Sequence, residues 1–316
     1  MDVSNGDLTL TSTQAADLLD VHPSTVKRWC NDGDLGYSTT QGGHRRIHLR
    51  DVSDFARSKG IRTILTPFHP YEPHVWTALR EAEDDGSFRR LHSLAMGWIH
   101  RGRLRRVARL YDALAQSRNV SLCRFCDEAV RGLMADVGRA WFEGRLRAGE
   151  EHMVSQAMTE VLLRLRDRNE RERDPSAPTQ GVALVGSAEG NQHHLGALSV
   201  RLLLERLGWE VLFLGPDVPL EDFGMIQRNR GADLVCVSMP PPAAVGDINR
   251  VVGVLRASYD VSRPFALALG GAVPAAVEAS VLDGPFVNVG IFQGCDSFQR
   301  ALGEDWVGGS GRRVAS

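Results

Sequence analysis

Residues 182–196 of the chain read Val-Ala-Leu-Val-Gly-Ser-Ala-Glu-Gly-Asn-Gln-His-His-Leu-Gly. The apolar run 182–185 is typical of a buried strand, and the apolar pattern over 195–207 predicts a helix. We expect further strands at 210–214, 234–238 and 265–269, and further helices at 220–229 and 249–258. This alternation predicts a Rossmann-like (flavodoxin-like) parallel α/β domain over residues 180–305, with ligands bound beyond the carboxyl ends of the strands.

Residues 74–172 carry an almost wholly helical pattern, and short amphipathic helices of this kind usually pack into a bundle. The apolar seams of these helices include Leu104, Val107, Tyr111, Leu114, Met158, Leu162 and Leu165. We expect linkers at Gly60–Pro73, which holds three prolines, and at the charged segment Asn169–Pro178. Residues 306–316 are rich in Gly and Ser and are expected to form a loose tail.

Residues 1–66 are expected to form a separate α+β head, so the chain is predicted to be multidomain. Thr11 or Ser12 can cap a first helix, and Pro23 suits the first turn of a second helix because its missing N–H is not needed there. The exposed face of this second helix is predicted to carry Ser24, Thr25, Lys27 and Arg28. A recognition helix presents such a face to the major groove of DNA.

Gly42 and Gly43 mark a hairpin tip, and a third helix is expected at residues 50–58. The hairpin continues with His44, Arg45 and Arg46, which can contact phosphates or a minor groove. The order helix, turn, helix, wing, helix resembles the winged helix-turn-helix head of MerR-family regulators. The resemblance implies double-stranded operator DNA as a partner, and the alternative is a small helical domain with a solvated basic turn.

The composition limits the classes of protein to consider. The chain of 316 residues has a net charge of −2, so a DNA-binding site must come from local clustering of basic residues. The five cysteines are an odd, scattered set, unlike a secreted disulfide framework. No apolar run reaches the ~20 residues that a membrane span needs, and the N-terminus does not resemble a signal peptide. These features predict a reduced, cytoplasmic protein with no membrane partner.

The loop after the first strand of the α/β domain contains Asn191-x-His193-x-x-Gly196. This pattern resembles the Asp-x-His-x-x-Gly signature of cobalamin-binding domains. The resemblance implies that His193 is the lower axial ligand of cobalt and that Gly196 lets the nucleotide tail pass close to the backbone. Later cofactor-binding positions of that family are matched at strand ends by Ser238, Gly270 and Gly271.

The loop also departs from the family pattern. Asn191 stands where the family has an acidic residue that orients the ligand histidine, and we expect an amide to weaken cobalt ligation. His194 is an adjacent alternative ligand, and Ser238-Met-Pro240 replaces the usual Ser-x-Leu. The alternative interpretation is a flavodoxin-like domain with a surface pair of histidines.

Trp141 is followed, after nine residues, by Glu151 and His152. This spacing, together with the head and the α/β pattern, resembles CarH/LitR-type regulators, which sense light through adenosylcobalamin. The resemblance implies that Trp141 covers the upper face of the cofactor and that Glu151 and His152 lie near the adenosyl group. The residue after this tryptophan is a histidine in the light sensors of the group, whereas here it is Phe142, which cannot ligate a metal. Taken alone, these residues would be ordinary core and a helix start.

These resemblances predict a transcriptional repressor, not an enzyme, that binds adenosylcobalamin and responds to light. One head offers few phosphate contacts, so specific binding is expected to need a homo-oligomer, a dimer or a tetramer. RNA polymerase at the promoter is a further expected partner. Two alternatives remain: a regulator with a light-independent or different ligand, and a corrinoid protein for methyl transfer. Cys123 and Cys126 form a single CxxC that we expect to be core.

Overall fold

The computed structural model describes residues 8–240, 243–271, 284–304 and 306–308. The chain divides into two compact units, residues 1–120 and residues 121–316. The helices expected to form one bundle over residues 74–172 therefore lie partly in each unit. The division into four parts, at residues 1–66, 74–172, 180–305 and 306–316, stays a prediction.

The first unit begins with the helices predicted for the head. They are α1 (Ser12–Leu19), α2 (Pro23–Asn31) and α3 (Leu49–Ser58). The side chain of Thr11 accepts a hydrogen bond from the backbone N–H of Gln14 at 3.2 Å, and the side-chain oxygen of Gln14 accepts one from the backbone N–H of Thr11 at 2.9 Å, which forms a capping box. Pro23 occupies the first position of α2, as predicted. Val26, on the inner face of α2, is fully buried.

A small antiparallel sheet completes the head. Its strands are β1 (Thr9–Leu10), β2 (Ser38–Thr39) and β3 (Arg45–His48), in the order β1-β3-β2. Thr39 pairs with Arg45, which confirms the hairpin whose tip holds Gly42 and Gly43. β1 was not predicted from the sequence, because two residues are too few to show a periodic pattern.

Helices fill the rest of the first unit. They are the 3₁₀ turn η1 (Thr66–Phe68), α4 (Glu72–Arg80), the π-helical η2 (Glu81–Asp85), α5 (Arg89–Ile99) and α6 (Leu104–Leu114). The predicted linker Gly60–Pro73 is packed instead of loose. Leu65 and Phe68 are buried within it, and Phe68 stacks on Trp98 with ring centroids 5.8 Å apart. The prolines restrict the backbone, but the apolar side chains between them still gain from burial.

The second unit begins with helices that run up to the α/β domain. They are α7 (Leu122–Arg124), the π-helical η3 (Phe125–Val130), α8 (Arg131–Phe142) and α9 (Ala148–Glu172). α9 extends into the predicted linker Asn169–Pro178. Residues 169–172 read Asn-Glu-Arg-Glu, three of which favour helices, and the first proline comes only at Pro175.

The remaining residues confirm the predicted parallel α/β domain. The strands are β4 (Val182–Ala188), β5 (Glu210–Val218), β6 (Leu234–Met239), β7 (Ala266–Gly271) and β8 (Val289–Phe292). The helices are α10 (Leu195–Arg206), α11 (Leu220–Arg230), α12 (Val245–Ala257) and α13 (Cys295–Gly303). The strand order is β5-β4-β6-β7-β8, with every pairing parallel.

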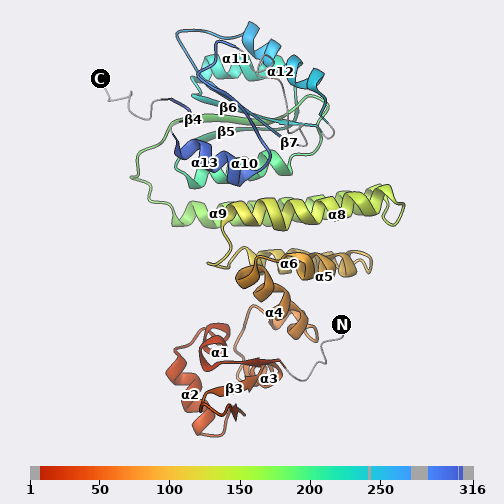
Figure 1. Cartoon of the computed structure of the whole chain (residues 1–316), viewed down its shortest axis with the longest axis vertical. Helices are drawn as coiled ribbons and strands as arrows, with labels where there is room; N and C mark the ends of the chain where they lie inside the picture. Colours follow the sequence, from red (N-terminus) through yellow and green to blue (C-terminus); the bar gives the residue numbers. More distant parts are fainter. Residues whose placement is uncertain (1–7, 241–242, 272–283, 305, 309–316) are drawn as a thin grey trace. The chain divides into compact units, whose positions relative to one another are not determined.

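The sheet is covered on both faces. α10 and α13 lie on one face and α11 and α12 on the other (Figure 1). The core between the sheet and the second pair of helices holds Phe223, Leu255 and Leu267, which are fully buried. Burial of one such side chain stabilises the fold by roughly 1.5–3 kcal/mol, so the sheet is a firm base for the loops at its edge.

Two further observations concern the ends and the helices of the chain. Trp306, assigned above to the loose tail, packs edge-on against Phe292 with ring centroids 5.2 Å apart, while residues 309–316 lie outside the described residues.

Among the residues that the structure describes, no helix combines the length and the apolar character needed to cross a membrane.

Candidate functional site

The carboxyl ends of three neighbouring strands bring the predicted residues of the α/β domain together. Ser187 of β4 lies opposite Ser238 of β6, and Ser238 lies opposite Gly270 of β7. Met239 pairs in the same way with Gly271. The loop after β4, which carries the two histidines, leaves the sheet at the same edge. The candidate site is therefore formed by β4, β6, β7 and this loop.

Asn191 anchors the loop at residues 189–194. Its side chain is almost fully buried, its Oδ1 accepts from the backbone N–H of His193 at 3.0 Å, and its Nδ2 donates to the carbonyl of Ser238 at 3.1 Å. The amide therefore ties the loop to the end of β6. We expected this residue to stand in for the acid that orients the imidazole of His193, but its amide contacts the backbone of His193 and of Ser238 instead of the imidazole.

Asp217, near the end of β5, holds the same loop from the other side. Its carboxylate accepts hydrogen bonds from the backbone N–H of Gly190 at 2.8 Å and from the amide of Gln192 at 2.9 Å. Its backbone adopts a left-handed conformation, with φ of 55°. Asp217 was not among the site residues predicted from the sequence.

The two histidines of the loop have different surroundings. His193 is exposed, and among the described residues none makes a hydrogen bond to its imidazole. His194 is half-buried, and its Nε2 lies 3.1 Å from the hydroxyl oxygen of Thr159 on α9. The imidazole of the predicted ligand, His193, is therefore accessible to a metal. The imidazole of the alternative ligand, His194, already contacts Thr159.

The glycines of the site serve different purposes. A Cβ atom at Gly196 would meet Oγ of Ser238 at 3.5 Å, so a side chain there would begin to fill the space beside Ser238. A Cβ atom at Gly271 would lie 2.7 Å from the carbonyl oxygen of Met239, and its φ is +108°. Gly271 is thus required by the contact between β6 and β7 themselves. The residues that follow, 272–283, lie outside the described part of the chain.

The end of α8 and the first turns of α9 carry the residues predicted to lie at the upper face of the cofactor. Trp141 is 52% exposed and Phe142 is 87% exposed. Glu151, in the first turn of α9, has a half-buried carboxylate that contacts Nδ1 of the exposed His152 at 2.8 Å. Trp141 is therefore not part of the core. A tryptophan with half of its surface exposed is unusual and is available to contact a ligand.

The cysteines of the CxxC pack where the helices meet the α/β domain. Cys123 and Cys126 are buried, and Sγ of Cys123 donates to the amide oxygen of Gln299 on α13 at 2.8 Å. Nearby, the carboxylate of Asp127 accepts from the backbone N–H of Cys295 and caps α13. Among the described residues, no group of three or more His, Cys, Asp or Glu side chains could hold a metal ion. The predicted core role of the CxxC is confirmed.

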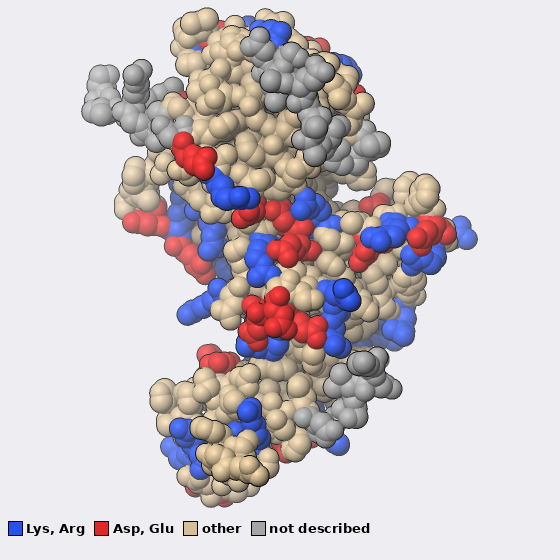
Figure 2. All heavy atoms as spheres, in the orientation of Figure 1, with Lys and Arg blue, Asp and Glu red and all other residues tan. Residues whose placement is uncertain are grey.

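The head presents a basic surface. Ser24, Lys27 and Arg28 are exposed on α2, and Thr25 is half-buried. In the wing, His44 is exposed while Arg45 and Arg46 are half-buried. Lys and Arg side chains are visible on the head in the lower part of Figure 2.

The wing and the recognition helix are linked by Arg45. Its guanidinium donates to the side chain of Asn31, at the end of α2, at 2.6 Å and lies over the ring of Tyr37 at 5.0 Å. This pair of contacts fixes the wing beside α2. Sequence reasoning missed Asn31 and Tyr37, since their roles depend on a contact across the hairpin.

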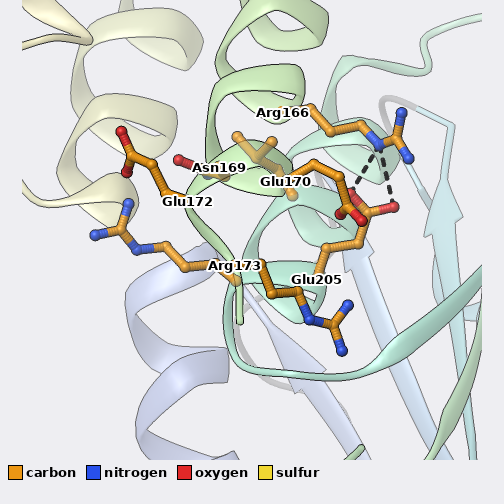
Figure 3. Close-up of a pocket in the computed structure, with 8 residues that line it drawn as sticks. Arg166, Asn169, Glu170, Glu172, Arg173 and Glu205 are labelled. Carbon is orange, nitrogen blue, oxygen red and sulfur yellow. Dashed lines mark hydrogen bonds and ion pairs between the residues drawn. The ribbon is translucent and has the colours of Figure 1, made fainter. Parts of the chain in front are cut away.

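A pocket of about 180 Å³ lies between the end of α9 and α10 (Figure 3). It is lined by Arg166, Asn169, Glu170, Glu172, Arg173, Leu202, Glu205 and Arg206. Arg166 donates to the carboxylate of Glu205 at 2.9 Å, so the pocket includes an ion pair that joins the two helices. The pocket lies at the end of α10 opposite to His194, and is separate from the loop site.

The fold and the two sites match known families in two places. A family model described as a helix-turn-helix domain matches residues 9–60, and one described as a B12 binding domain matches residues 181–302. The chain therefore joins a DNA-binding type of head to a B12-binding α/β domain.

Three relatives show how such domains occur elsewhere. The chain is 29% identical, over 181 residues, to the HTH-type transcriptional repressor CarH of Myxococcus xanthus, covering 56% of each chain. It is 27% identical to the HTH-type transcriptional repressor CarA of the same organism, over 46% of each chain. It is 30% identical to the dimethylamine corrinoid protein of Methanosarcina barkeri, over 33% of this chain and 48% of that protein. The matches span about half the length of these relatives.

Proposed function

We propose that the chain is a transcription regulator whose binding to DNA is controlled by a corrinoid. The observation that carries this proposal is the presence of a helix-turn-helix head and a B12-binding domain in one chain. The similarity to the repressors CarH and CarA supports repression as the outcome. Because the target is promoter DNA, the proposal gives the chain a cytoplasmic location, with RNA polymerase as an indirect partner.

The residues of the loop site suit a large cobalt corrinoid. His193 offers an exposed imidazole, a common metal ligand, at the carboxyl edge of the sheet. The missing side chain at Gly196 leaves space beside Ser238, and Trp141 offers exposed aromatic surface for the opposite face of the cofactor. Glu151 and His152 would then lie near an upper ligand. When bound, an adenosylated corrinoid supplies a cobalt–carbon bond that light can break.

Control by light and by assembly belongs to the same proposal. Adenosylcobalamin would stabilise contacts between the α8–α9 turn and the α/β domain, and these contacts would favour an oligomer that presents several heads to one operator. A ligand shifts such an equilibrium only by its different affinity for the two states. Phe142 cannot ligate cobalt, so the state after illumination cannot be held by a second imidazole at that position.

A second candidate function is corrinoid-dependent methyl transfer. The similarity to the dimethylamine corrinoid protein favours this alternative for the B12-binding part of the chain. The helix-turn-helix head and the basic wing favour the regulator, since a methyl carrier has no use for a DNA-binding surface.

An absorption spectrum tests the proposal. Purified full-length chain is incubated with adenosylcobalamin in the dark, washed, and measured before and after green illumination. We expect a retained corrinoid spectrum that changes with light. Retention without a light response would favour the light-independent regulator, and loss of the corrinoid on washing would contradict corrinoid control altogether.

A further inference from the structure

Two adjacent histidines stand in the loop that would hold the cobalt, and only one can be its axial ligand. His193 is exposed, while His194 precedes α10 and turns towards α9. The nitrogen of His194 that lies farthest from its backbone, Nε2, is the one that contacts Thr159. The nitrogen best placed to reach a metal is therefore already in use.

The hydroxyl of Thr159 can act on His194 in a defined way. Its single hydrogen points to the carbonyl oxygen of Ser155, one turn earlier on α9, at 2.9 Å. With that hydrogen on Ser155, the oxygen can still accept, so its contact with His194 is a hydrogen bond when Nε2 carries the imidazole proton. Thr159 is 8% exposed, so water competes weakly for this contact. The contact holds His194 in one tautomer and in one direction.

Polar contacts continue along α9 from Ser155, whose carbonyl holds the hydroxyl of Thr159. The hydroxyl of Ser155 donates to the carboxylate of Glu151 at 2.8 Å, and Glu151 contacts His152. Glu151, Ser155 and Thr159 are spaced four residues apart, so they share one face of the helix. These polar contacts extend from Thr159, beside His194, to Glu151, which is expected near the upper face of the cofactor. The two residues are eight positions apart, a rise of ~12 Å along the helix.

We propose that Thr159 is a positioning residue that assigns the axial ligand: by holding His194 against α9, it leaves His193 as the histidine available to cobalt. The inference rests on the proposed function, because it takes the cobalt of a corrinoid as the metal. It adds a residue outside the loop, on a helix, to the determinants of ligation.

The test asks which histidine ligates cobalt in full-length chain loaded with hydroxocobalamin in the dark and reduced to Co(II). Electron paramagnetic resonance with ¹⁴N- and ¹⁵N-labelled histidine distinguishes a protein imidazole from the base of the cofactor. We expect a histidine signal in the unchanged chain and in His194→Ala, and none in His193→Ala. The double variant His193→Ala, Thr159→Val should regain the signal, because His194 is then released.

Two matched controls separate this role from a general loosening of the fold. His193→Ala with Thr159→Ser keeps the hydroxyl and should stay without a histidine signal. His193→Ala with Thr77→Val removes a hydroxyl that makes the same kind of bond within α4, to the carbonyl of Pro73 at 2.9 Å, and should also stay without it. A histidine signal in His193→Ala alone, or none in the double variant with Thr159→Val, would overturn the proposal.

A second readout needs no corrinoid. In nuclear magnetic resonance spectra of the cofactor-free chain, the ring nitrogens of His194 should report the Nε2–H tautomer in the unchanged chain and in Thr159→Ser. Thr159→Val should give a mixture of tautomers. If the chain retains no corrinoid, the proposed function fails while this measurement still tests Thr159. An unchanged tautomer in Thr159→Val would contradict the contact itself.

Discussion

At the level of single residues, the amide of Asn191 makes one hydrogen bond as an acceptor and one as a donor. The acceptor bond goes to the backbone N–H of His193 and the donor bond to the carbonyl of Ser238. A carboxylate could replace the first bond but not the second. The asparagine is therefore explained by the backbone of the site, and its replacement by the family's usual acid is not a neutral change here.

We predict that Asn191→Asp destabilises the chain. The new carboxylate would face the carbonyl oxygen of Ser238 in a buried position, which costs roughly 1–3 kcal/mol of unfolding free energy. Urea unfolding followed by circular dichroism measures this change. Asn288→Asp is the matched control, since its amide also donates to a carbonyl, that of Trp306, but the residue is exposed. Equal effects of the two substitutions would contradict the explanation.

Site residues could be predicted from the sequence where they belong to a motif. They could not be predicted where their role depends on a tertiary contact. The sequence pattern indicated His193 and Gly196, because their spacing matches a known signature. It did not indicate Asp217 or Thr159, which reach the same loop from β5 and α9. No spacing within the chain encodes such distant contacts, since they depend on how the helices pack against the sheet.

At the level of elements, the hairpin wing and α2 act as one basic surface. Arg45 is tied to Asn31, so the neighbouring Arg46 and the exposed Arg28 are presented on a fixed frame. Phosphate contacts from such residues release counterions, and they make DNA binding depend on salt.

We predict that Arg46→Ala weakens binding to double-stranded DNA of any sequence. Each phosphate contact that is lost makes the negative slope of log affinity against log salt concentration less steep by about 0.9. Fluorescence anisotropy with labelled DNA at several salt concentrations measures the slope. Arg300→Ala, on α13 in the B12-binding domain, is the control and should leave the slope unchanged. A slope that stays the same in Arg46→Ala would exclude this residue from the DNA interface.

Longer elements were predicted better than short or terminal ones. The alternating patterns of the α/β domain indicated β4, β6 and α10 within a few residues, because buried strands and amphipathic helices have strong periodicity. β8 and α13 were not predicted, and neither was the packing of Phe68 in the proline-rich segment. Those stretches are short or lack a clear period, so tertiary packing determines their structure.

At the level of the whole molecule, the fold shields the cysteine thiols from solvent. All five cysteines are buried, and burial raises the pKa of Cys123 to about 12. Burial alone raises the pKa of the Cys236 thiol further above its usual value. The thiolate is the reactive form, so the folded chain should resist alkylation and oxidation near neutral pH.

These shifts predict a loss of stability in alkali. The unfolded chain gives up thiol protons above pH ~8.5, while the folded chain keeps them. The contribution to stability is thus fully present below that pH and is lost as the pH rises towards the raised values. The urea midpoint should fall between pH 8 and pH 10, and Cys236→Ala should reduce the fall. An equal fall in Cys236→Ala would show that other groups cause it.

The measurement that tests the central claim most directly is the affinity of the full-length chain for the DNA upstream of its own gene, with and without adenosylcobalamin in the dark. An electrophoretic mobility shift assay gives both affinities, and the absorption spectrum of the same sample reports whether the corrinoid is retained. Corrinoid control predicts tighter binding with the cofactor, and loss of that gain on illumination if light is the signal. A chain that retains the corrinoid but binds this DNA equally well in its presence and absence would contradict the account.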